Sequence, residues 1–249
     1  MLKSTDISQA EIPELLNSLE KFCALLNSKP FDNWGGIRGV SAFALYWYIQ
    51  KIKPDLIIEV GVWKGFSTWI IENAAPDAEI ICLDPMFFLE EAIKSGSINA
   101  AAINTNIIGD FYRTKRAHYF SNDFSCWDKN DLLKDSKNPC VFFDDHQNKL
   151  PRLKQAKEYG IKHIIFDDNQ PFLYTHKSLE IYKQDPIIEK YLLSIIHDYQ
   201  IFPALWDTTI SYGGTPLQLT GIEIPAHDYF KPVYDDKQWH SFVTKVELK

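Results

Sequence analysis

The sequence has little sulfur, and its cysteines form no metal-binding pattern. It contains four cysteines and two methionines, and Cys23, Cys82, Cys126 and Cys140 are far apart along the chain. A structural zinc site would need closely spaced pairs of ligands. Because Cys82 and Cys140 stand within apolar runs, we expect buried, reduced thiols.

A long apolar run and an excess of positive charge are also missing. No stretch approaches the ~20 apolar residues that cross a bilayer, and residues 1–14 lack the basic start and apolar centre of a signal peptide. We therefore expect a cytoplasmic protein with no membrane partner. The net charge of -7 argues against a nucleic-acid partner, and the short basic run at residues 113–116 is typical of a solvated surface.

The pattern of apolar residues predicts the fold class. Residues 12–26 and 42–52 repeat apolar side chains at helical spacing, and from residue 55 short apolar runs alternate with helical segments. This alternation is typical of parallel strands joined by crossover helices. We predict an α/β, Rossmann-like, doubly wound and mostly parallel sheet with helices on both faces. The expected strands are residues 56–60, 80–83, 117–120, 141–143 and 163–166.

The economical division is a single domain, residues 1–249, with a helical N-terminal extension (1–53) and a Rossmann-like core (54–249). Helices are expected over residues 150–160 and 186–199, and no element can be assigned to residues 200–249. The apolar face of residues 12–26 needs a partner, which is either the chain's own core or a second subunit. A homo-oligomer therefore stays open.

The turn after the first predicted strand is the most informative segment. Residues 59–68 read EVGVWKGFST and join the strand to a helix. A ligand in an open parallel sheet lies against the carboxyl ends of the strands, where glycine allows close approach. Ser67 or Thr68 can cap the helix, whose first amides favour a negative group such as a carboxylate.

The same turn disfavours a dinucleotide. The dinucleotide fingerprint needs glycines at steps of two and three, but Trp63 and Phe66 stand where the second and third would follow Gly61. A pyrophosphate would meet bulky side chains there. A dehydrogenase is therefore a disfavoured alternative.

What remains, an acid at Glu59 followed by Gly61 and Gly65, resembles the first motif of the Rossmann-like methyltransferases. In that family the backbone of this turn passes the methionine part of S-adenosylmethionine. Trp63 replaces the middle glycine common in the motif. The resemblance implies S-adenosylmethionine as cofactor, bound through Glu59, Gly61, Val62, Trp63, Gly65, Ser67 and Thr68.

An acid also follows the second predicted strand. Asp84 comes about 20 residues after Gly65, the spacing at which a carboxylate meets ribose hydroxyls in such folds. Asp84 could instead form a turn, but the preceding glycine turn favours the ribose role. The methyltransferase resemblance also places residues 121–124, and with them Asp123, near the adenine. An ordinary loop explains that segment equally well.

Two further predicted strands each end in a pair of aspartates, Asp144 and Asp145 after one and Asp167 and Asp168 after the next. The tips of neighbouring strands are about 5 Å apart, so four carboxylates there repel each other. Protonation, hydrogen bonds or a cation such as Mg²⁺ would stabilise them. The alternative interpretation is that both aspartate pairs only form turns at the strand ends.

At this point the resemblance narrows to the metal-dependent macrocin O-methyltransferase and cephalosporin-hydroxylase-like group. It implies a divalent ion, for which Mg²⁺ is our expectation, held by Asp144 or Asp145 together with Asp167 and Asp168. The sequence leaves open which of Asp144 and Asp145 points into the site. Asp144 is also a candidate for contacting the cofactor. A nearby imidazole can accept the proton of the acceptor, so His146, with Asp145 beside it, is the catalytic candidate. His146 could also bind the metal or lie on the surface.

The leading hypothesis is a methyltransferase that transfers the methyl group of S-adenosylmethionine, with metal assistance, to an oxygen of a small polyhydroxylated acceptor such as a sugar or a secondary metabolite. A metal-independent N- or C-methyltransferase is the first alternative. A non-catalytic cofactor-binding subunit is the second. The sequence leaves the acceptor open.

Overall fold

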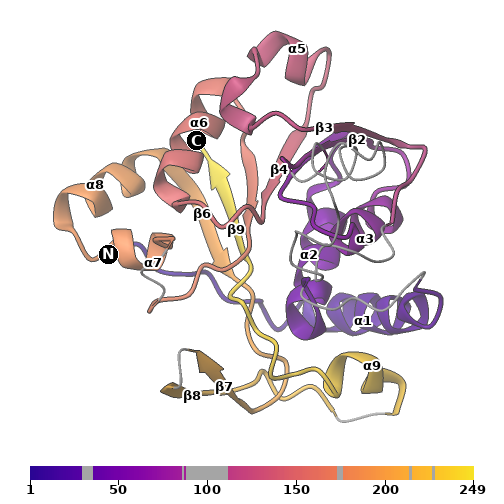
Figure 1. Ribbon diagram of the computed structural model, residues 1–249. Helices are drawn as coiled ribbons and strands as arrows, with labels where there is room; N and C mark the ends of the chain where they lie inside the picture. The colour runs from indigo at the N-terminus through magenta and orange to yellow at the C-terminus, as the bar shows by residue number, and fades with distance from the viewer. Residues whose placement is uncertain (30–35, 86, 88–111, 173–175, 213–214, 226–227) are drawn as a thin grey trace, which may run out of the picture.

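The computed structural model describes the chain except for residues 30–35, 86, 88–111, 173–175, 213–214 and 226–227. Figure 1 shows the chain as a whole, and its main feature is a seven-stranded sheet. The strands follow the order β3-β2-β1-β4-β5-β9-β6. The first five strands in this order are parallel, while β9 runs antiparallel to both of its neighbours. The strands are β1 (Leu56–Val60), β2 (Glu79–Leu83), β3 (Ala117–Phe120), β4 (Pro139–Phe143), β5 (His163–Phe166), β6 (Ile196–Ile201) and β9 (Thr244–Leu248).

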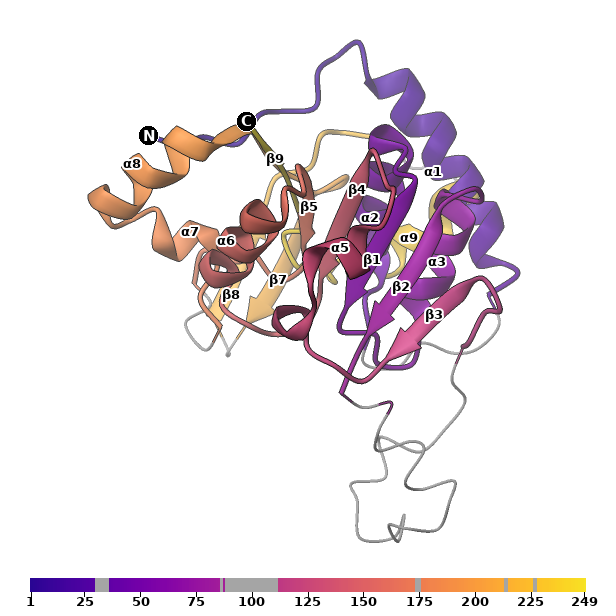
Figure 2. The same ribbon diagram turned by 90° about the horizontal axis from the view of Figure 1, so that it is seen from above.

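Helices cover both faces of this sheet (Figure 2). One face packs against α1 (Ile12–Leu26), α2 (Gly39–Ile52), α3 (Phe66–Ala74) and α9 (Lys231–Tyr234). The other face packs against α5 (Lys129–Leu133), α6 (Lys149–Tyr159), α7 (Leu179–Tyr182) and α8 (Pro186–Ile195). Two short 3₁₀ helices are η3 (Phe124–Cys126) and η4 (Asp228–Phe230). The predicted doubly wound α/β fold is confirmed.

The central strands are apolar because both of their faces are buried. Every residue of β1 is buried, with Ile57 in one hydrophobic cluster and Leu56 and Ile58 in the other. Parallel strands covered by helices on both sides give such continuous apolar runs. This pattern is why the four parallel strands other than β3 could be predicted within two residues of their observed bounds. The edge strand β3 is only partly buried and gave a weaker apolar run.

The predicted helix over residues 186–199 is correct only in its first part. Helix α8 begins after the Asp185 cap, with Pro186 in its first turn, and ends at Ile195. The following residues form β6, which pairs with β9 and has a register shift between Ile196 and Asp198. Because the pairing partner lies far away in the sequence, the local helical spacing of residues 186–199 was misleading.

The segment that could not be assigned from sequence contains a hairpin and the closing strand. Strands β7 (Thr208–Tyr212) and β8 (Thr215–Leu219) form a two-stranded antiparallel sheet apart from the main one. Strand β9 then returns between β5 and β6. In the sequence, the hairpin and helix α9 therefore lie between β6 and β9, which are neighbours in the sheet.

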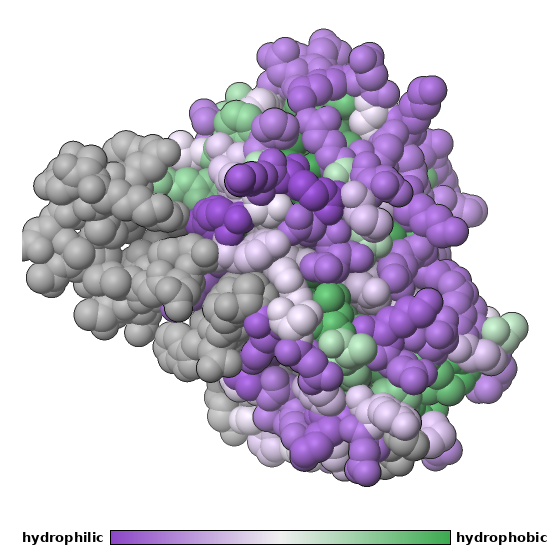
Figure 3. Space-filling view, turned by 90° about the vertical axis from the view of Figure 1, so that its right-hand side faces the viewer, coloured by the Kyte–Doolittle hydropathy of each residue, from purple (hydrophilic) through white to green (hydrophobic). Residues whose placement is uncertain are grey.

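The apolar face of α1 packs within the chain. Leu15, Leu19 and Phe22 are fully buried, and the ring of Phe22 lies 5.7 Å from that of Phe43 on α2. This contact covers the face that a partner subunit could have covered. Within the described ranges, no helix reaches the length and apolarity of a membrane span. On the face seen in Figure 3, hydrophilic side chains predominate and hydrophobic ones form small separate patches.

Candidate functional site

A cavity of about 990 Å³ opens at the carboxyl ends of β1, β2, β4 and β5. Most of the residues predicted from sequence lie around it. They are Gly61, Val62, Trp63, Asp84, Asp123, Asp144, Asp145, His146, Asp167 and Asp168. Glu59, Gly65, Ser67 and Thr68 are not among the described residues that line the cavity.

The turn after β1 owes its shape to glycine. Gly61 has φ of 88°, and a Cβ there would lie 2.4 Å from the backbone oxygen of Asp144. Both its conformation and the close approach of the β4 tip therefore exclude a side chain. Trp63, two residues after Gly61 in the same turn, also has a positive φ, of 50°. Such strain in a residue other than glycine is common at binding sites.

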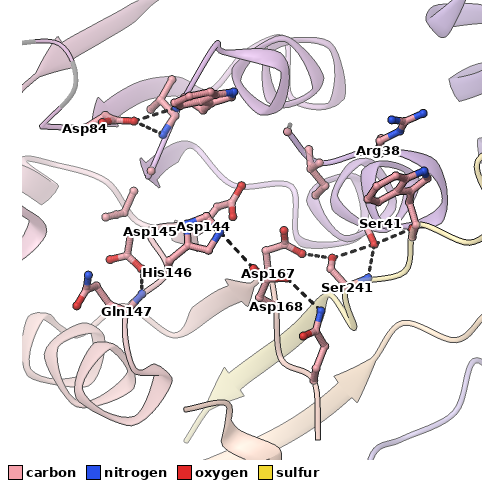
Figure 4. A pocket seen from close by; sticks show the side chains of 18 of the residues that line it. Arg38, Ser41, Asp84, Asp144, Asp145, His146, Gln147, Asp167, Asp168 and Ser241 are labelled. Carbon is pink, nitrogen blue, oxygen red and sulfur yellow. Dashed lines mark hydrogen bonds and ion pairs between the residues drawn. The ribbon is translucent and has the colours of Figure 1, made fainter. Parts of the chain in front are cut away.

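Asp84 holds this turn in place. Its Oδ2 accepts hydrogen bonds from the backbone N–H groups of Val62, at 2.7 Å, and Trp63, at 2.9 Å (Figure 4). The side chain is almost fully buried, yet it lines the cavity. Asp84 thus connects the end of β2 to the turn after β1, at the position where the sequence predicts a ribose contact.

Glu59 supports the turn from behind. Its side chain is fully buried, and its Oε2 accepts hydrogen bonds from Thr68, at 2.6 Å, and from the Cys82 thiol, at 3.3 Å. Burial raises the pKa of Glu59 to about 7, although these hydrogen bonds oppose the rise. The contact ties β1 to helix α3 and strand β2, so Glu59 shapes the turn without lining the cavity.

The carboxylate of Asp145, a predicted metal ligand and catalytic residue, is paired with an arginine. The guanidinium of Arg152 on α6 contacts Asp145 Oδ2 at 2.5 Å and Asp123 Oδ2 at 2.5 Å. The hydrogen bonds from Arg152 hold the pKa of Asp123 well below its usual range. The structure thus joins Asp145 to the predicted adenine-side loop, and it lies outside the group of side chains that could hold a metal.

Asp167 is likewise engaged by the protein. It accepts a hydrogen bond from the hydroxyl of Ser241, whose backbone N–H donates to the hydroxyl of Ser41, at 2.8 Å (Figure 4). Burial and the charge of Asp168 raise the pKa of Asp167 to about 7. Ser241 thus links Asp167, at the end of β5, to the start of α2. Asp167 also lies outside the candidate metal group.

One carboxylate from each pair remains, together with a histidine. Side-chain ligand atoms of Asp144, His146 and Asp168, which we call the ion triad, lie within 4.8 Å of one another. Nε2 of His146 is 3.4 Å from Asp168 Oδ2, and Nε2 of His176 is 3.6 Å from the same oxygen. Two carboxylates and an imidazole are suitable donors for a divalent ion, so these residues fit a metal.

Burial and neighbouring charges shift the pKa values of all three residues in this group. Burial and the charges of Asp167 and Asp168 raise the pKa of Asp144 well above its usual range. Burial also acts to raise the pKa of Asp168, but hydrogen bonds from His146 and His176 outweigh it and lower that pKa. The hydrogen bond to Asp168 raises the pKa of His146. His146 and Asp168 also have positive φ angles, 53° and 52°.

Sequence reasoning missed three participants in the site. Arg152, His176 and Ser241 come from α6, the segment before α7, and the segment before β9. Arg152 gave no signal because it stands in an ordinary amphipathic helix, next to Leu153. The other two belong to segments for which the sequence offered no element, so nothing placed them near the strand tips.

No protein-family profile and no curated protein sequence matches the chain. Among solved structures, it is similar to the O-methyltransferase TomG from Streptomyces achromogenes in complex with S-adenosylmethionine (12% identity, 98% of this chain and 90% of that chain covered, TM-score 0.44). It is also similar to an O-methyltransferase from Bacillus cereus in complex with S-adenosylhomocysteine (14%, 94% and 90%, TM-score 0.41). A third is the tRNA (m1A58) methyltransferase TrmI from Aquifex aeolicus (9%, 93% and 76%, TM-score 0.44). Matches at this level carry no conclusion about activity, so the fold rests on the strand order and the function on the site.

Proposed function

We propose that the chain binds S-adenosylmethionine at the turn after β1 and transfers its methyl group to an oxygen of a small acceptor. The observation that carries this proposal is the pair of hydrogen bonds between Asp84 and the turn that contains Gly61. The carboxylate meets the backbone of Val62 and Trp63 beside a large cavity. S-adenosylmethionine is the methyl donor, and the protein's part is to hold it in line with the acceptor oxygen.

The two sides of the cavity suit two parts of this reaction. Gly61, Trp63 and Asp84 offer a close backbone surface and a carboxylate for the cofactor, as the sequence motif predicts. The same cavity is also lined by the carboxylates of Asp144 and Asp168. They suit an acceptor that offers hydroxyl groups. Such an acceptor would be one of the polyhydroxylated small molecules expected from the sequence resemblance.

Metal assistance is the finer part of the proposal. The ion triad would hold a divalent ion, which would lower the pKa of an acceptor hydroxyl when bound. His146 then has two distinguishable roles. As a ligand it binds the ion through an imidazole nitrogen, and as a base it accepts the acceptor's proton directly.

A second candidate, metal-independent methyl transfer, is favoured by one specific observation. Part of the repulsion that argued for a metal is relieved by the protein itself, since Arg152 pairs with Asp145, Ser241 bonds to Asp167 and histidines flank Asp168. Activity that survives EDTA would favour this candidate. Activity that is lost with EDTA and restored by a divalent ion would support the metal-assisted form.

Calorimetric titration with S-adenosylhomocysteine tests the cofactor site. Asp84→Ala should weaken binding at least tenfold, because the turn and the predicted ribose contact are lost together. Asp84→Asn should also weaken binding while keeping an oxygen that can accept from Val62 and Trp63, which separates loss of the carboxylate from collapse of the turn. Asp77→Ala, an exposed aspartate away from the cavity, is the control. Unchanged affinity in both Asp84 variants would refute the ribose role.

A further inference from the structure

Part of the cavity is used neither by the proposed cofactor turn nor by the ion triad. Its walls come from the start of α2, from strand β7 and from the segment before β9. In Figure 4, Arg38, Ser41 and Ser241 lie on one side of Asp167, and Asp145 lies on the other. Because this part belongs to the same cavity, it is the place for the body of an acceptor whose hydroxyl group reaches the strand tips.

Trp239 is a large aromatic side chain in this part of the cavity. It lines the cavity and is nevertheless 49% exposed. Its backbone is fixed on both sides, since its N–H donates to the carbonyl oxygen of Asp236 at 2.9 Å and its carbonyl oxygen accepts from the hydroxyl of Ser41 at 3.4 Å. An exposed ring on a fixed backbone is suited to binding, because a ligand gains a large contact area while the protein loses little conformational entropy.

Arg38 supports the indole ring of Trp239. Its guanidinium carbon lies over the ring, 4.7 Å from the centroid. Asp236 holds the guanidinium by accepting hydrogen bonds from its Nε, at 3.1 Å, and its Nη2, at 2.6 Å. The two segments come so close that a Cβ on Gly39 would lie 2.3 Å from the Asp236 carbonyl oxygen. Because its charge is balanced by a carboxylate, Arg38 is better suited to positioning the ring than to binding an anion.

Hydrogen bonds connect Trp239 to the strand tips. The backbone N–H of Ser241 donates to Ser41 Oγ at 2.8 Å, and the Ser41 hydroxyl donates to the carbonyl oxygen of Trp239. The hydroxyl of Ser241 donates to Asp167, which directly precedes Asp168 of the ion triad. The indole ring is therefore held at a fixed place relative to the carboxylates that the proposed function assigns to the acceptor.

The neighbouring walls combine apolar and hydroxyl side chains. Ile37 and Ile210 line this part of the cavity and are buried. Thr209 and Ser211 line it as well, on either side of Ile210 along β7. Ligand pockets of this kind bind the body of a ligand through apolar contacts and orient it through a few polar groups. The side chains of these walls thus suit an uncharged ring with hydroxyl groups at its edge.

We propose that Trp239 is the platform on which the acceptor stacks a ring, and that Arg38 is the positioning residue that fixes the indole plane. The acceptor then has an apolar ring face and hydroxyl groups at the ring edge, a chemistry that a phenol and a sugar share. Such a ring covers an indole face, whereas an open-chain polyol offers no comparable surface. This inference rests on the proposed function and deepens it by naming the residue that selects the acceptor.

The test is a titration of the full-length chain, saturated with S-adenosylhomocysteine and Mg²⁺, with catechol and separately with methyl glucoside, followed by ligand-observed NMR. The two probes distinguish a phenol from a sugar. For the probe that binds, Trp239→Ala should weaken the affinity about tenfold, while Trp239→Phe should keep most of it because a ring remains. Tyr229→Ala is the matched control, since Tyr229 is also an exposed aromatic residue but does not line the cavity. All variants should bind S-adenosylhomocysteine as the wild type does.

A double-mutant cycle tests the positioning role of Arg38. Arg38→Gln should weaken probe binding about threefold in the wild type and have no further effect in Trp239→Ala, because Arg38 acts through the ring. Equal and independent effects in both backgrounds would overturn that role. If Trp239→Ala bound the probe as tightly as the wild type, or if the wild type bound neither probe, the stacking platform would be refuted. The cofactor site would still be judged separately, by S-adenosylhomocysteine binding to the wild type and the Asp84 variants.

Discussion

The two sides of the cavity are built on different principles. The proposed cofactor side is local, since a single turn after β1 takes its shape from Gly61 and is held by one carboxylate, Asp84. The part of the cavity with Asp145 and Asp167, which we call the aspartate side, depends on distant residues. Arg152 and Ser241, which contact these two aspartates, come from elements far along the chain. A local site should fail through backbone geometry. A site assembled from distant residues should fail through loss of its counter-charges.

Gly61→Ala should have the largest effect. The added Cβ would lie 2.4 Å from the Asp144 oxygen at a φ of 88°, so the tip of β4 must move. We expect a loss of about 4 kcal/mol in the free energy of unfolding, measured by urea denaturation. Gly160→Ala is the control, since that glycine has φ of 80° but no atom within 4 Å of its Cβ position. If both variants lose the same stability, close packing at Gly61 is not what shapes the turn.

Arg152→Leu should be the next most damaging change. It leaves Asp145, whose side chain is 11% exposed, without its partner, and breaks the contact with Asp123. Removing one member of such a buried pair costs roughly 3 kcal/mol. The check is the urea midpoint of Arg152→Leu against Lys154→Leu on the same helix. A loss no greater than that of the control would mean that Asp145 does not depend on Arg152.

Glu59 makes stability depend on pH. Its pKa is 4.5 in the unfolded chain and about 7 in the folded one. Its stabilising contribution is therefore complete below pH 4.5 and disappears as pH rises through about 7. Between pH 5 and pH 8 the wild type should lose about 2.5 kcal/mol more than Glu59→Gln. Parallel stability curves for the two proteins would show that Glu59 is ionised in the fold at both pH values.

His146→Ala should have the smallest effect and sharpens the description of the aspartate side. As a member of the ion triad, His146 should contribute about tenfold, or about 1.4 kcal/mol, to Mn²⁺ affinity. Asp145→Asn should leave that affinity unchanged, because Arg152 already engages the carboxylate. The reverse order of effects would restore Asp145 as the metal ligand predicted from sequence. Loss of turnover in His146→Ala with unchanged Mn²⁺ affinity would identify His146 as a base.

The sequence predicts the parts of the molecule that depend on local pattern. The five parallel strands, the turn at Gly61 and the place of Asp84 follow from apolar runs and glycine spacing. The same reasoning brought both aspartate pairs to neighbouring strand tips. It could not tell which of the four aspartates other side chains engage, because this depends on Arg152 and Ser241, whose contacts are set by tertiary packing.

The errors beyond residue 186 have a related cause. The helix predicted from residue 186 was expected to continue to residue 199, yet residues 196–201 form β6 because β9 offers them a partner. Likewise, residues 200–249 show no clear local preference, and their structure depends on the sheet edge that receives β9. His176 and Ser241 belong to regions of this kind, so their roles in the site could only be seen in three dimensions.

The antiparallel strand β9 has a consequence for how the protein folds. It separates β5 from β6, although both of those strands are synthesised well before it. Until residues 244–248 leave the ribosome, β5 has an unpaired edge, and Ser241 is not yet available to Asp167. Pairings between such distant segments close slowly. The turn after β1 can therefore form early in synthesis, whereas the part of the cavity that contains Asp167 reaches its final arrangement late.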